Sequence, residues 1–82
     1  MYFVANWKMY GSKNSLNTLD KVIKFSKSKE IKKGRIIYCP PYTLLSSIYK
    51  KFQNCLIDIG AQNCHESSEY GPHTGFINPK LI

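Results

Sequence analysis

The sequence contains no run of about 18 apolar residues, so we expect no membrane-spanning helix. Its start, residues 1–5, is too short for a secretory signal, and no basic residue precedes the apolar ones. Cysteine is scarce and unpatterned, because Cys39, Cys55 and Cys64 are odd in number and form no C-x-x-C motif. That spacing argues against a disulfide framework. These absences together predict a cytosolic protein in a reducing compartment.

Acidic residues are also few. Five Asp and Glu against twelve Lys and Arg give a formal net charge of +7, which favours anionic partners such as phosphates, nucleic acid or a membrane surface. Seven of the twelve basic residues fall between Lys21 and Arg35, as is typical of a solvated helix face and its following loop. Hydrophobic residues make up 43% of the chain, enough for a globular protein, but 82 residues provide one small domain at most.

Short apolar runs alternate with amphipathic segments. The apolar runs, bounded by Gly and Pro, predict strands at residues 2–5, 35–39 and 56–61. Apolar residues at helical spacing predict two helices between the strands. The first helix begins near a cap at Asn14 or Ser15, and its stripe comprises Leu16, Leu19, Val22, Ile23, Phe25 and Ser26. The stripe of the second comprises Leu45, Ile48, Tyr49 and Phe52. Asn78 and Pro79 are typical of the start of a third helix, after a long polar loop at residues 62–76.

Strands that alternate with helices predict parallel β-α-β units with right-handed crossovers, so the expected fold class is α/β. Three strands and two complete helices are too few to close a barrel or to cover an open sheet. Both outer strands would be edges with unpaired backbone groups. Residues 1–82 are therefore interpreted as one piece of a larger fold.

The first expected strand is an apolar run, predicted to be buried, that ends in polar residues. Side chains alternate along a strand, so Asn6 and Lys8 are expected on one side and Trp7 on the other. Ligands bind at the carboxyl ends of strands in sheets with helical crossovers. The pair therefore indicates a binding site with a neutral donor beside a cation, and a strand running into a solvated loop is the alternative.

Three short blocks share one order and spacing with a known family. They are N-W-K-M at residues 6–9, C-P-P at residues 39–41, and G-A-Q-N-C-H at residues 60–65 followed by Thr74-Gly75. Together they closely resemble triosephosphate isomerase across all 82 residues. The resemblance implies a partial (β/α)8 TIM barrel, the first three strands and two complete helices of a barrel of about 250 residues. It also implies a homodimer that interconverts dihydroxyacetone phosphate and glyceraldehyde 3-phosphate in glycolysis and gluconeogenesis, without a cofactor.

The resemblance assigns roles to five residues. Asn6 and Lys8 match the family's substrate-binding pair, and Lys8 is also the expected catalytic residue, because an ammonium in a desolvated pocket stabilises the charge of an enediolate. Residues 62–76 resemble the family's interdigitating loop, in which Thr74 steadies the Asn and Lys of the neighbouring subunit. Met9 and Gln62 are expected near the same dimer interface. A mobile surface loop is the alternative for this segment.

Several positions depart from the family pattern. Tyr10 stands where an Asn is common, Pro72-His73 replaces an Ala-aromatic pair, and Phe76 replaces an acidic residue. The last change is expected to remove an intersubunit charge pair. His65 with its neighbours Cys64 and Glu66 has no zinc-type spacing, so no metal site is predicted.

The catalytic machinery of the family is incomplete in these residues. Its general base and its electrophilic histidine lie later in the barrel, and no Glu or His here matches their motifs. Proton abstraction needs a positioned base in a closed pocket, so the chain is predicted to be inactive alone. Two alternatives remain: a non-catalytic remnant of a disrupted isomerase gene, and a basic nucleic-acid-binding module that rests on charge alone.

Overall fold

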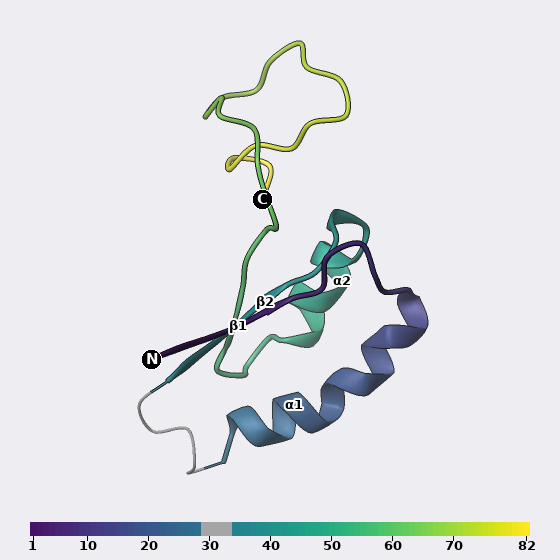
Figure 1. Ribbon diagram of the computed structural model, residues 1–82, viewed down its shortest axis with the longest axis vertical. Coiled ribbons are helices and arrows are strands. Elements are labelled where there is room, and N and C mark those ends of the chain that lie inside the picture. Colours follow the sequence, from purple (N-terminus) through teal and green to yellow (C-terminus); the bar gives the residue numbers. More distant parts are fainter. Residues whose placement is uncertain (29–33) are drawn as a thin grey trace.

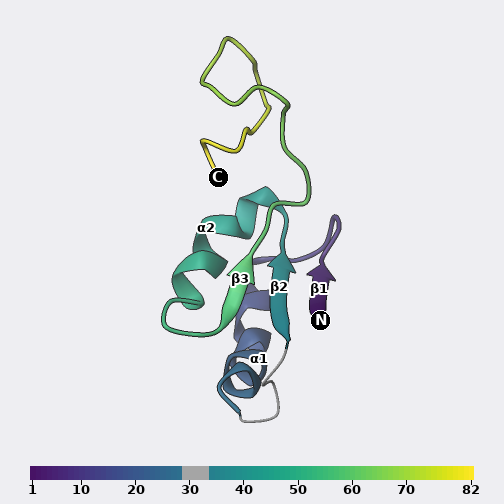
Figure 2. The same ribbon diagram turned by 90° about the vertical axis from the view of Figure 1, so that its left-hand side faces the viewer.

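The structure is a computed structural model and describes residues 1–28 and 34–82. Three strands form one parallel sheet in the spatial order β1-β2-β3, and helices connect them (Figures 1 and 2). The elements are β1 (Tyr2–Asn6), the 3-10 segment η1 (Lys13–Thr18), α1 (Leu19–Ser26), β2 (Arg35–Cys39), α2 (Tyr42–Lys51) and β3 (Ile57–Ile59). This confirms the expected α/β class and its parallel topology.

The core lies between the sheet and the two helices, which cover the same face of the sheet (Figure 1). Its buried residues come from both helices and from β2 and β3, and they are Leu19, Ile36, Leu44, Ile48, Phe52 and Ile57. The strand register places Asn6 opposite Cys39 and Tyr38 opposite Ile59. The carboxyl ends of all three strands therefore lie at one edge of the sheet.

The first strand is exposed, so the expectation of a buried strand was wrong. Tyr2, Phe3 and Val4 keep 66%, 52% and 60% of their surface accessible. The reason is topological, because β1 pairs only with β2 among the described residues and no described strand lies on its other side. The apolar run therefore forms an edge strand whose side chains are exposed in this structure.

The first helix begins earlier than expected and in a tighter form. Its N-cap is Ser12, whose backbone N–H donates to Ser15 Oγ at 2.9 Å, and the α-helical part starts only at Leu19. Of the expected stripe, Phe25 is half exposed, whereas Ser26 is buried, and its hydroxyl is satisfied by donating to the carbonyl of Ile23 at 2.7 Å. The lysines of the basic cluster at positions 29, 32 and 33 lie outside the described residues.

The second helix and the third strand differ from expectation at their margins. Leu44 is buried on α2 while Tyr49 is 60% exposed, because no helix of the described residues covers the face that carries Tyr49. Strand β3 covers three residues instead of six, since only residues 57–59 pair with β2. Leu56 is left 76% exposed just before it.

Residues 62–76, called the arm below, contain no helix or strand, as expected. The arm extends from the carboxyl edge of the sheet and lengthens the molecule to 46 × 28 × 21 Å (Figure 2). Asn78 caps a single turn after it, since its Oδ1 accepts a hydrogen bond from the Leu81 N–H at 2.9 Å. The predicted capping role of Asn78 is confirmed.

Candidate functional site

The two polar residues at the end of β1 are brought together by a turn. The Trp7 N–H donates to the Cys39 carbonyl at 3.0 Å, but Lys8 then adopts a left-handed backbone with φ of +53°. The alternation of side chains along the strand therefore ends before Lys8. The position of the Lys8 side chain does not follow from strand alternation, contrary to what the sequence pattern suggested. Instead, Asn6 Oδ1 accepts a hydrogen bond from the Lys8 N–H at 2.8 Å. Asn side chains commonly close turns in this way.

Trp7 anchors this turn to the core. Its ring meets Tyr38 edge-on with centroids 6.2 Å apart, and Tyr38 meets Phe52 in the same manner at 5.4 Å. Burial raises the pKa of Tyr38. Gly11 packs closely against Trp7, since a β-carbon there would lie 2.9 Å from the indole ring, and its φ of +112° also favours glycine. The segment carrying Asn6 and Lys8 thus packs, through Trp7, against an aromatic cluster that includes Tyr38 and Phe52.

The polar groups of the pair remain available to a ligand. Three ion pairs occur within residues 1–28 and 34–82, namely Arg35 with Asp58, Lys51 with Asp20, and Lys80 with Glu69. None of them uses Lys8, which is exposed. Asn6 uses its oxygen in the turn, and its Nδ2 donates to no acceptor in the described part of the chain. The site therefore presents an ammonium and an amide donor to solvent.

Gln62 connects this turn to the neighbouring strand. Its Nε2 donates to the Lys8 carbonyl at 2.7 Å and to the Cys39 carbonyl at 3.0 Å. The sequence interpretation placed Gln62 only at a dimer interface and missed these bonds. Its position three residues after the last residue of β3, at the carboxyl edge of the sheet, was the only available signal.

The arm is closed upon itself beyond Gln62. The His65 N–H donates to the Ile77 carbonyl at 2.7 Å, and the Tyr42 hydroxyl of α2 hydrogen-bonds to Asn63 at its base. The rings of His65 and His73 lie 4.5 Å apart, and Phe76 packs edge-on against His65 at 5.1 Å.

Phe76 thus occupies an aromatic cluster within the arm. Besides Gln62, the expected interface residues are Met9 and Thr74, and both are exposed to solvent. Met9 is 95% exposed, and Thr74 is exposed on the arm. No hydrogen bond in the described ranges joins either of them to the Asn6–Lys8 turn.

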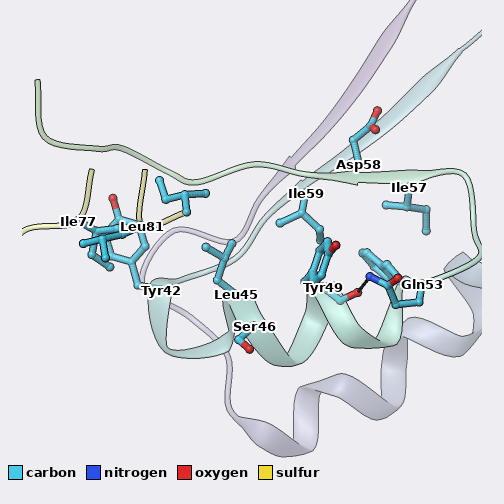
Figure 3. Close-up of a pocket in the computed structure, with 12 residues that line it drawn as sticks. Tyr42, Leu45, Ser46, Tyr49, Gln53, Ile57, Asp58, Ile59, Ile77 and Leu81 are labelled. Carbon is cyan, nitrogen blue, oxygen red and sulfur yellow. Dashed lines mark hydrogen bonds between the residues drawn. The ribbon is translucent and has the colours of Figure 1, made fainter. Parts of the chain in front are cut away.

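An apolar groove of about 690 Å³ lies elsewhere, between α2, β3 and the C-terminal turn (Figure 3). Leu45 and Tyr49 of α2 face Ile59 of β3 across it, and Leu81 lies at one end. Neither Asn6 nor Lys8 lines this groove. It follows the unpaired edge of β3 and is an uncovered apolar surface of the sheet and helix.

The described residues contain neither a metal-binding cluster nor a membrane-spanning helix. No three His, Cys, Asp or Glu side chains in residues 1–28 and 34–82 are grouped so that they could hold a metal ion. No helix in that part of the chain is long and apolar enough to cross a membrane. All three cysteines are free thiols.

Comparison with known proteins gives one consistent family. The family model described as triosephosphate isomerase matches residues 1–82. The triosephosphate isomerase of Wolbachia pipientis wMel is 41% identical, and the match covers 96% of this chain and 31% of the relative. The triosephosphate isomerase of Ehrlichia chaffeensis is 33% identical, and the match covers 100% of this chain and 33% of the relative. The crystal structure of triosephosphate isomerase from Bartonella henselae superposes with a TM-score of 0.79 at 35% identity, covering 93% of this chain and 30% of the other.

The chain therefore spans about a third of the length of the relatives that it matches. Because the family model matches residues 1–82, this chain belongs to the triosephosphate isomerase family.

Proposed function

We propose that this chain supplies the substrate-binding Asn6 and Lys8 of a triosephosphate isomerase. The substrates would be dihydroxyacetone phosphate and glyceraldehyde 3-phosphate, as the family resemblance implies. The observation that carries the proposal is the Asn6–Lys8 turn at the carboxyl end of a parallel strand, with an ammonium that no described carboxylate neutralises. Ligands bind at this end of the strands in α/β folds.

The two residues have separate chemical tasks. The Lys8 ammonium would stabilise the negative charge that develops on a substrate oxygen in an enediolate and would attract the phosphate dianion. The free Asn6 amide N–H groups would hold a substrate oxygen in place. The proton transfers between carbons need a base, and the family's base and electrophilic histidine match no residue of this chain. We therefore expect the chain alone to lack isomerase activity.

A second copy of the chain is the proposed protein partner. The arm extends away from the sheet, and Thr74 on it would contact the Asn6 and Lys8 of the other copy, with Met9 and Gln62 near the same interface. The exposure of Met9 and its neighbour Tyr10, 95% and 77% accessible, supports this arrangement, because adjacent exposed apolar side chains are suited to burial in an interface. The three free thiols support a reducing, cytosolic location.

The test joins residues 1–82 to the remaining two thirds of the Wolbachia pipientis relative in one polypeptide and measures triose phosphate isomerisation. We expect turnover from the joined polypeptide and none from the 82-residue chain. Lys8→Ala should lower turnover by about a thousandfold, since a preorganised charge is removed. The matched control is Lys13→Ala, which removes another exposed lysine without a described ion pair and should leave turnover unchanged. Full turnover in Lys8→Ala would contradict the proposed role.

A further inference from the structure

The Gln62 side chain holds the ends of two strands together. Its Nε2 carries two hydrogens, so it donates to the Lys8 carbonyl at 2.7 Å and to the Cys39 carbonyl at 3.0 Å at the same time. The first acceptor belongs to the turn after β1, and the second is the last residue of β2. The amide therefore fixes the position of the turn relative to the neighbouring strand.

The backbone of Lys8 needs such support. Its φ of +53° is disfavoured for a residue with a β-carbon, so the conformation persists only where surrounding groups hold it. Asn6 Oδ1 holds the Lys8 N–H at 2.8 Å, and Gln62 holds the Lys8 carbonyl. With both peptide groups of Lys8 bonded, the direction in which its side chain leaves the backbone is set.

We propose that Gln62 is a positioning residue that orients Lys8 toward the ligand. This inference rests on the substrate-binding role proposed above for Lys8. Gln62 is also the first residue of the arm, so the same two hydrogen bonds connect the seating of the arm with the backbone of Lys8. An arm that packs against a second copy would thereby stabilise the orientation of Lys8 in its own chain.

The structural test uses the 82-residue chain and NMR, and it needs no activity. Gln62→Glu replaces a double donor with an acceptor that faces two carbonyl oxygens. The matched control is Gln53→Glu, because Gln53 Nε2 donates to a single carbonyl, that of Tyr49 at 3.3 Å on α2. We expect amide hydrogen exchange at Lys8 to accelerate about tenfold in the first variant and to stay unchanged in the second.

Equal exchange at Lys8 in both variants would overturn the proposal. If Gln62→Glu does not fold, Gln62→Met provides the same comparison, because it keeps the length and apolar stem of the side chain while removing both donors.

The functional test uses the joined polypeptide and a double-mutant cycle. Gln62→Met should lower kcat/KM about tenfold when Lys8 is present and less than twofold in the Lys8→Ala background, because its effect acts through Lys8. A tenfold loss in both backgrounds would refute the positioning role. Absence of turnover from the unsubstituted joined polypeptide would instead refute the proposed function, and the exchange measurement would still decide whether Gln62 fixes the backbone of Lys8.

Discussion

Substitution of Asn6 separates the structural task of its oxygen from the binding task of its nitrogen. The oxygen accepts one hydrogen bond, from the Lys8 N–H at 2.8 Å, and the nitrogen has no described acceptor. Asn6→Ala removes both atoms, and the loss of one intramolecular hydrogen bond at an exposed site costs about 1 kcal/mol. Asn6→Asp keeps an acceptor at the same position and should cost much less. The two variants should therefore differ in stability while both lose the amide donor.

Urea unfolding provides the measurement, because Trp7, the single tryptophan, adjoins the site and reports its packing by fluorescence. With an m-value of about 1 kcal/mol/M for a small chain, Asn6→Ala should lower the unfolding midpoint by about 1 M and Asn6→Asp by much less. In the joined polypeptide, both variants should lower turnover by about tenfold or more, because both lose the amide donor. The new carboxylate of Asn6→Asp also repels a phosphate dianion. Equal destabilisation by Asp and Ala would refute the assigned role of Oδ1.

Three further predictions concern the fold. Ile48 is fully buried at 0% exposure, so Ile48→Ala should cost about 2–5 kcal/mol and abolish the folded circular dichroism signal, whereas Tyr49→Ala on the exposed face of the same helix should not; similar losses would contradict the packing described. Burial raises the pKa of Tyr38, so the folded chain keeps the phenol proton at pH values at which the unfolded chain has released it. Stability should then be fully present below pH of about 10 and fall as the pH rises above it, and Tyr38→Phe should flatten that fall in urea titrations; an unchanged slope would count against the cause. Val4→Lys on the open edge of β1 should reduce concentration-dependent association in sedimentation experiments, and unaltered association would show that this edge is not the contact.

Glycine and proline residues at the ends of elements explain which elements were predictable from the sequence. Strand β2 was expected at residues 35–39 and is found at Arg35–Cys39, because Gly34 precedes it and Pro40 and Pro41 cannot extend its ladder. Strand β3 is shorter than its apolar run, since its length depends on which residues find partners on β2 and not on composition. The exposure of Phe25 and Tyr49 has the same origin, because helical spacing identifies an apolar stripe without showing how much of it is covered.

The candidate site was predictable only in its residue types. The polar ending of the first strand and the family resemblance both indicated Asn6 and Lys8. The left-handed turn that joins them was not visible, because strand alternation was assumed to continue through Lys8. The bonds of Gln62 span 54 and 23 residues along the chain, and no local pattern encodes a contact between a side chain and backbone at such a separation.

The spatial order of the sheet, β1-β2-β3, is also the order in which a ribosome makes the strands. Each strand after the first therefore pairs with one that already exists, and the sheet grows at the edge of β3, where the apolar groove lies open. Such a sheet can assemble during translation, since β2 and β3 each find their partner strand already made. The outer edge of β1 is made first and gains no partner from the described part of the chain. Its exposed apolar side chains are consequently the surface that a chaperone would have to shield for the longest time.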